Sequence, residues 1–322
     1  KVRHGHLLFT NEKIHLDTLY GSIGESSFSL KGHLTNYLAY VLHNEEEIRG
    51  DLEFQSEYFN LNELMRSEKL TRNDTAHHHL EKFDIPKNIN FTFDAEISNL
   101  IYKELIILDL RGEVVLNDGI LSLKETDFHS LDAHFRIAGD YDTRDVHHPR
   151  FDLAVNVEDL DIGKAHAAFA TVQAVAPASE HTYGVFSVDY SLKGELLPNM
   201  FPVLSSLQGG GTIRIREATI NGMKLFHHIS GLTKKESLRN PELKDLVIQT
   251  SVENGTVFVK PFSMNLAGFA TDIEGKHELT GTMNYVLKIG LPPFEVVKIP
   301  MHVSGTYDKP KIHLGKGHES TF

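Results

Sequence analysis

The chain has 322 residues, of which 40% are apolar and 24% charged, as in an ordinary folded protein. It contains no cysteine and no tryptophan, so disulfide frameworks, zinc–thiolate sites, iron–sulfur clusters and thiol nucleophiles are excluded. The formal charge of -12, from 44 acidic and 32 basic side chains, argues against a nucleic-acid partner and against adsorption to an anionic membrane surface.

Strict alternation of apolar and polar residues recurs along the chain and predicts strands with one wet face and one dry face. In the N-terminal half the dry positions include Phe28, Leu30, Leu34, Phe91, Phe93, Ile97, Phe151, Leu153 and Val157. In the C-terminal half they include Phe186, Val188, Tyr190, Leu192, Ile213, Ile215, Met283, Tyr285, Leu287, Met301 and Val303. Turn signals such as Asn117-Asp118-Gly119 separate the strands, so we expect consecutive strands to pair antiparallel.

Helical periodicity is confined to short pieces. Helices are predicted over residues 165–174, 199–207 and 225–232, with a further candidate over 61–70. A polar connecting loop is predicted over residues 67–84. The helices do not alternate regularly with strands, which disfavours a parallel βαβ plan.

A loose repeat places glycine between two apolar residues in several strands. Its glycines are Gly32, Gly139, Gly194 and Gly305. Glycine inside a strand marks a bend, a bulge or a close approach of backbones. The repeat therefore predicts a sheet that is curved along its length.

The C-terminal half resembles the AsmA-like C-terminal region. The resemblance is carried by the ordered blocks Gly209-Gly210-Gly211-Thr212-Ile213-Arg214-Ile215, Asn221-Gly222, Val259-Lys260-Pro261-Phe262, Leu279-Thr280-Gly281-Thr282-Met283-Asn284-Tyr285 and Gly305-Thr306-Tyr307-Asp308-Lys309-Pro310. It covers roughly half the chain. Residues before about 160 carry only generic alternation.

The resemblance implies an all-β, mainly antiparallel fold, a long curved and twisted sheet that forms a taco-like groove or half-barrel, with a few short helices. On this resemblance we expect a repetitive N-terminal β-sheet region over residues 1–160 and the AsmA-like C-terminal region over residues 161–322, continuous with the first. The family belongs largely to Gram-negative envelopes and typically begins with a membrane helix. It implies a periplasmic protein anchored to the inner membrane through a segment that this sequence lacks.

Candidate metal and catalytic sites are weak. The histidines at 77–79, 147–148 and 227–228 are neighbours that would point to opposite faces of a strand, and His4 with His6 gives two ligands without a third. No nucleophile elbow, phosphate loop or dinucleotide fingerprint is present. We therefore expect no enzyme, no metal and no cofactor, with solvent-facing histidines.

The leading functional hypothesis is an envelope scaffold whose apolar groove binds or conducts phospholipid acyl chains between the inner and outer membranes and so supports outer-membrane integrity. The eleven dry positions of the C-terminal half given above are the lipid-groove candidates. The alternative is a purely structural or protein-interaction scaffold, with its dry face filled by its own side chains, because a packed core and an open groove share one alternation pattern. A carbohydrate-active enzyme or lectin is disfavoured by the lack of tryptophan.

Overall fold

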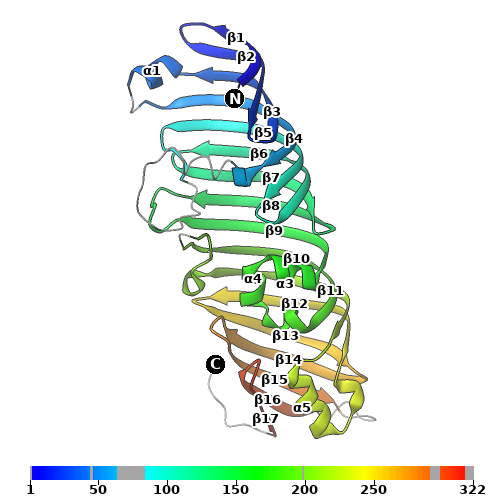
Figure 1. The fold of residues 1–322 in the computed structure, drawn as a ribbon. Coiled ribbons are helices and arrows are strands. Elements are labelled where there is room, and N and C mark those ends of the chain that lie inside the picture. The colour runs from blue at the N-terminus through cyan, green and yellow to red at the C-terminus, as the bar shows by residue number, and fades with distance from the viewer. Residues whose placement is uncertain (1, 44–45, 64–83, 198, 291–297, 316–322) are drawn as a thin grey trace. The chain divides into compact units, whose positions relative to one another are not determined.

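The computed structural model describes residues 2–43, 46–63, 84–197, 199–290 and 298–315 (Figure 1). Strands account for 66% and helices for 15% of the structure. The seventeen strands belong to one mostly antiparallel sheet that is not closed into a barrel. The predicted fold class, a mainly antiparallel all-β sheet with a few short helices, is confirmed.

The chain divides into two compact units, which we call the N-terminal unit (Lys1–Val155 and Lys193–Phe201) and the C-terminal unit (Asn156–Leu192 and Pro202–Phe322). The N-terminal unit contains helix α1 (Tyr37–Leu42) and the first part of β9 (Arg150–Asp161). Its complete strands are β1 (Val2–Phe9), β2 (Lys13–Ile23), β3 (Ser26–Thr35), β4 (Ile48–Asn60), β5 (Ile89–Tyr102), β6 (Leu105–Asn117), β7 (Ile120–Ser130) and β8 (Ala133–Asp142).

Strands β1 to β8 pair in chain order, and all these pairs are antiparallel except one. Strands β4 and β5 are parallel, with Ile48 opposite Ile89. The expectation of antiparallel pairing is wrong here, because β5 begins at the same end of the sheet as β4. A parallel pair requires a long connection, here residues 61–88. Residues 61–63 are helical; the rest of the helix predicted over 61–70, and the predicted polar loop up to residue 83, lie outside the described residues.

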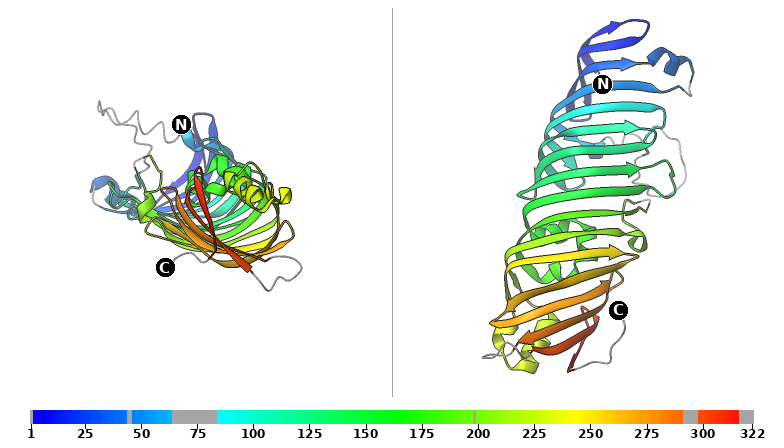
Figure 2. Two further views of the ribbon diagram at one scale, coloured as in Figure 1. Left: turned by 90° about the horizontal axis from the view of Figure 1, so that it is seen from below. Right: turned by 180° about the vertical axis from the view of Figure 1, so that it is seen from behind.

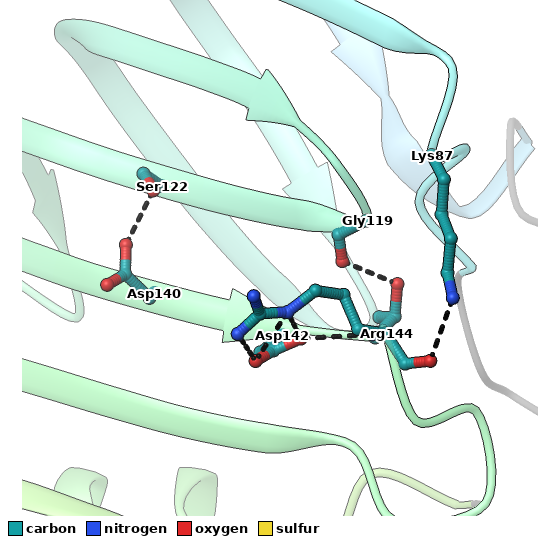
Figure 3. A network of polar contacts seen from close by, with 7 residues as sticks. Lys87, Gly119, Ser122, Asp140, Asp142 and Arg144 are labelled. Atoms are coloured by element: carbon teal, nitrogen blue, oxygen red, sulfur yellow. Dashed lines mark hydrogen bonds and ion pairs between the residues drawn. The ribbon is translucent and has the colours of Figure 1, made fainter.

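Polar contacts fix the chain where it leaves this connection and enters β5 (Figure 3). The amide of Ile85 donates to the hydroxyl of Thr143 at 3.1 Å, and that hydroxyl donates to the carbonyl of Gly119 at 2.8 Å. Lys87 donates to the carbonyl of Arg144 at 3.2 Å. The segment before β5 is thereby tied to the turn between β6 and β7 and to the residues that follow β8.

Bulges bend the strands of the N-terminal unit. The pairing of β6 with β7 slips between Leu108 and Arg111, where Asp109 has a φ of 52°. The pairing of β7 with β8 slips between Leu123 and Thr126. A bulge that includes a left-handed residue bends its strand and increases the local twist. Curvature in this unit therefore has a second source besides the glycine repeat.

Gly32 shows what the repeated glycines do. Its φ is +127°, and a Cβ at this position would lie 2.1 Å from the carbonyl oxygen of Asp51 on the neighbouring strand. No side chain fits that distance, and an L-residue rarely adopts that φ. The glycine therefore permits the close approach of β3 and β4, one of the roles that the repeat predicted.

The C-terminal unit contains the last part of β9, most of β10 (Thr182–Glu195) and seven further strands. These are β11 (Gln208–Ile220), β12 (Glu242–Glu253), β13 (Thr256–Leu266), β14 (Phe269–Glu278), β15 (Thr282–Gly290), β16 (Lys298–Thr306) and β17 (Pro310–Leu314). From β11 to β17 each pairs antiparallel with the next. Helices α3 (Ile162–Ala168), α4 (Ala170–Val175) and α5 (Lys224–Thr233) lie on one side of these strands (Figures 1 and 2).

The helix predictions have mixed outcomes. The helix predicted over 225–232 is confirmed as α5. The helix predicted over 165–174 is two helices, because Phe169 between them is extended, with φ of -121° and ψ of 109°. The prediction over 199–207 is wrong except for one 3-10 turn, η2 (Leu204–Ser206). Two further 3-10 turns, η1 (Pro177–His181) and η3 (Glu236–Leu238), and α1 were not predicted.

Candidate functional site

Two continuous rows of apolar side chains and glycines cross strands β2 to β8 on one face of the N-terminal unit. The strand register places these residues side by side, from each strand to the next. The first row is Ile14, Leu34, Gly50, Phe91, Leu116, Leu121 and Tyr141, and the second is Leu16, Gly32, Leu52, Phe93, Val114, Leu123 and Gly139. We call them the apolar rows. No charged side chain interrupts either row.

The apolar rows are long and partly accessible. Six intervals between seven strands correspond to about 29 Å, at roughly 4.8 Å per strand. Leu16 and Leu52 are buried, at 4% and 8% exposure, but the other non-glycine members are only half-buried. Helix α1 buries none of its own residues. The rows therefore present an apolar surface about as long as the roughly 30 Å hydrocarbon core of a bilayer.

The opposite face of the same strands is charged. A hollow of about 730 Å³ lies over β4 to β7 and is lined by Glu53, Gln55, Asp94, Glu96, Arg111, Glu113, Lys124 and Glu125, with Ala95 and Gly112. Lys124 pairs with Glu113 at 3.2 Å, and Arg111 lies 4.0 Å from Glu96. Five carboxylates against two cations leave this face acidic. The two faces of the unit thus differ as the alternation of the sequence predicts.

The lipid-groove candidates of the C-terminal unit share one face but differ in burial. The register places Tyr285 opposite Val303 and Leu287 opposite Met301. Ile215, Met283, Leu287, Met301 and Val303 are buried in one hydrophobic cluster, and Phe186, Ile213 and Tyr285 pack against it half-buried. Val188, Tyr190 and Leu192 are half-buried.

Helices cover that part of the face. The same cluster contains Leu225, Phe226 and Ile229 of α5, Leu238 of η3 and Ile162 of α3. Ile229 has 0% and Val303 1% exposure. An acyl chain beside Val303 would have to displace these helical side chains, because protein interiors are close-packed. The cluster therefore forms a packed core at these positions.

On the same face, Tyr190 of β10 forms a hydrogen bond to Thr250 of β12. Its hydroxyl lies 3.0 Å from the hydroxyl of Thr250, which is opposite Gly211 on the neighbouring strand. A Cβ on Gly211 would lie 2.6 Å from the Tyr190 ring, so the glycine leaves room for it. Burial raises the pKa of Tyr190.

His277 on β14 is buried at 4% exposure, which contradicts the prediction that the histidines face solvent. Its Nδ1 lies 2.8 Å from the hydroxyl of Tyr285, and its Nε2 lies 3.0 Å from the carbonyl oxygen of Val175 at the end of α4. Burial lowers the pKa of His277 and raises that of Tyr285. The position of His277 in its strand does predict this burial, because His277 has the same parity as Ile273 and Gly275 on the dry face.

Most other described histidines fit the prediction, but His33, His134, His166, His181 and His302 are half-buried. His147, His148, His227 and His228 are exposed, and His148 pairs with Asp145 at 3.2 Å. Residues 77–79 lie outside the described part of the chain. Within the described part, no group of three or more histidine, aspartate or glutamate side chains could hold a metal ion.

The apolar rows of the N-terminal unit were not among the candidate site residues. Alternation predicts Phe91 and Phe93 as dry-face positions, but the AsmA-like resemblance covers only the C-terminal half of the chain. Comparison of the sequence with protein families and curated proteins, and of the structure with solved structures, finds no match. Within the described residues, no helix has the length and apolar character needed to span a membrane.

Proposed function

We propose that the chain is an envelope scaffold that binds or conducts phospholipid acyl chains along the apolar rows of its N-terminal unit. The observation that carries this proposal is the continuity of the two rows across seven strands together with their partial exposure. Among the described residues this surface is only partly covered, and soluble proteins rarely leave a contiguous apolar surface of this extent partly exposed unless it binds something. The AsmA-like resemblance supports a location in the periplasm and an anchor in the inner membrane.

The energetics suit a conduit. A straight acyl chain of about 14 methylenes gains on the order of 11 kcal/mol on leaving water, at about 0.8 kcal/mol per methylene. A bilayer offers nearly the same gain, so transfer between a membrane and the rows is close to neutral. Acyl chains have no polar groups to read, which fits rows made of Leu, Val, Ile, Phe and glycine, with one tyrosine, Tyr141, at the β8 end.

A purely structural role is the second candidate, and the C-terminal unit favours it. There the dry face is filled by α5 and its neighbours, so that Met301 and Val303 belong to a packed core. If the whole protein is a structural or protein-interaction scaffold, purified protein should carry no lipid.

A matched pair of neighbouring valines separates the two candidates. Val114 lies in an apolar row between Phe93 and Leu123, whereas Val115 lies on the other face between Thr92 and Ser122, and both are half-buried. Protein purified from a bacterial envelope is extracted with organic solvent, and its phospholipid is measured by mass spectrometry. We expect stoichiometric phospholipid with the wild type and with Val115→Glu, and its loss with Val114→Glu. Reproducible absence of lipid from the wild type would favour the structural role.

A further inference from the structure

An exposed apolar tip projects from the N-terminal unit where the β1–β2 turn meets helix α1. Its members are Leu7, Leu8, Phe9, Leu38, Val41 and Leu42, with exposures of 38%, 51%, 63%, 43%, 71% and 72%. Both segments lie at the same end of the strands, because β1, β2, β3 and β4 pair antiparallel in succession. We call these six residues the apolar tip.

Helix α1 is unusual for a surface helix. All six of its residues, Tyr37 to Leu42, are apolar or aromatic, yet none is buried. A helix that is hydrophobic all round is normally buried, and one of six residues is too short to be stable through its own hydrogen bonds. Within the described residues, α1 therefore leaves its aliphatic side chains Leu38, Val41 and Leu42 exposed.

The apolar tip is braced rather than loose. The Tyr37 hydroxyl donates to the carbonyl of Thr10 at 2.7 Å, and the side-chain amide of Asn36 donates to the carbonyl of Glu47 at 2.7 Å. The rings of Phe9 and Tyr37 are arranged edge to face, with their centroids 6.3 Å apart. These contacts join the β1–β2 turn to α1 and hold their aliphatic side chains outward.

We propose that the apolar tip docks the protein on a lipid bilayer by inserting these side chains at the membrane interface. This inference rests on the proposed function and adds a partner surface to it. Residues 36–43 contain no Asp, Glu, Lys or Arg, so this segment offers a protein partner no charged side chain to pair with. Aliphatic side chains beside tyrosines are the composition that membrane interfaces select.

The apolar tip is also continuous with the apolar rows. Phe9 pairs with Ile14, the first member of one row, and Leu7 pairs with Leu16, the first member of the other. An acyl chain that leaves a bilayer at the tip would thus meet an unbroken apolar path along the unit. A second copy of the chain is a poorer occupant, because six side chains fall short of the roughly 20–30 residues per partner of a stable interface.

The docking is apolar and not electrostatic. Glu12 and Glu46 flank the tip, and Glu47 pairs with Arg49 at 2.6 Å, so these flanking residues carry no net positive charge and anionic lipid should not strengthen binding. Full-length protein should therefore float with phosphatidylcholine vesicles, and neither high salt nor added phosphatidylglycerol should increase the bound fraction.

The test compares two exposed sites that should both tolerate a carboxylate. Val41→Asp/Leu42→Asp changes the tip, and Ile106→Asp changes a residue that is 55% exposed at the other end of the strands. We expect the vesicle partition constant to fall by about tenfold or more for the tip variant, because two apolar side chains that insert only partly contribute at least that factor together. It should stay unchanged for Ile106→Asp. Equal flotation of the tip variant and the wild type, or no flotation of the wild type, would overturn the proposal.

A fluorescence measurement gives a second readout. Since the chain has no tryptophan, Val41→Trp introduces a single reporter. Its emission should shift to the blue when vesicles are added and should be quenched by lipids with brominated acyl chains. An unshifted emission would contradict docking. So would a dimer of the wild type that does not bind vesicles and that the tip substitutions dissociate. Val114→Glu should float like the wild type while losing phospholipid. If Val114→Glu loses phospholipid but Val41→Asp/Leu42→Asp floats like the wild type, only the docking surface is rejected. If the wild type floats but carries no phospholipid after purification, only lipid binding by the apolar rows is rejected.

Discussion

The imidazole of His277 and the hydroxyl of Tyr285 lie 2.8 Å apart on adjacent strands and share a hydrogen bond in the core of the C-terminal unit. The Val175 carbonyl can only accept, so Nε2 of His277 carries the proton and Nδ1 accepts from Tyr285. The neutral ring thus joins α4 to the sheet. A charged ring there would lose its hydration without gaining an anionic partner among these contacts.

Acid should therefore destabilise the fold through His277. Burial holds its pKa below the ordinary value of about 6.5 that it has when unfolded, so its contribution is fully present above that pH and is lost as pH falls toward the lowered folded pKa. His277→Gln keeps a donor and an acceptor but does not titrate. Thermal melts across this range should show a shallower acid loss for His277→Gln than for the wild type.

The matched control is His313→Gln, because His313 is exposed on β17. It should retain the wild-type dependence on pH. An equal dependence in the wild type and in His277→Gln would show that other groups dominate acid unfolding.

A carboxylate at Val303 should unfold the C-terminal unit. Val303 is 1% exposed and belongs to the packed cluster, so Val303→Glu buries a charge without a partner at a cost of several kcal/mol. Ser304→Glu, one residue along and half-buried on the other face, should cost less than about 1 kcal/mol. Denaturant unfolding measures both. A folded, lipid-carrying Val303→Glu protein would mean that this face opens in solution.

The same glycine-to-alanine change should have opposite effects at two sites. Gly32→Ala places a Cβ 2.1 Å from the Asp51 carbonyl oxygen at a φ of +127°, and should destabilise by about 1–3 kcal/mol or more. Gly231→Ala in α5 meets no atom within 4 Å and should stabilise by about 0.4–1 kcal/mol. The difference between their free energies of unfolding is the measurement. Similar values would show that β3 and β4 can separate without cost.

Local sequence patterns predicted much of this fold. The period of two identified the strands and the dry face that Tyr285 shares with Val303, and Asn117-Asp118-Gly119 predicted a turn in which Asp118 and Gly119 have φ of 45° and 76°. These features depend on neighbours in the chain, where steric preference acts directly.

What sequence did not predict depends on long-range packing. Nothing local distinguishes the parallel pairing of β4 with β5 from another hairpin. Alternation also cannot tell whether a dry face is covered, so Met301 under α5 and Phe93 in an apolar row look alike in sequence although one is buried and the other half-buried. His277 is buried because of its strand parity, whereas its residue type alone predicts a solvent-facing side chain.

Site-specific photo-crosslinking in the full chain tests acyl-chain binding most directly. A photoreactive phenylalanine analogue is placed at Phe93, in an apolar row between Leu52 and Val114, and separately at Asp94, its exposed neighbour on the charged face. After irradiation in a bacterial envelope, mass spectrometry of the intact protein measures phospholipid adducts. Binding along the rows predicts adducts at position 93 and none at position 94. Absence of adducts at position 93, or equal adducts at both positions, would contradict it.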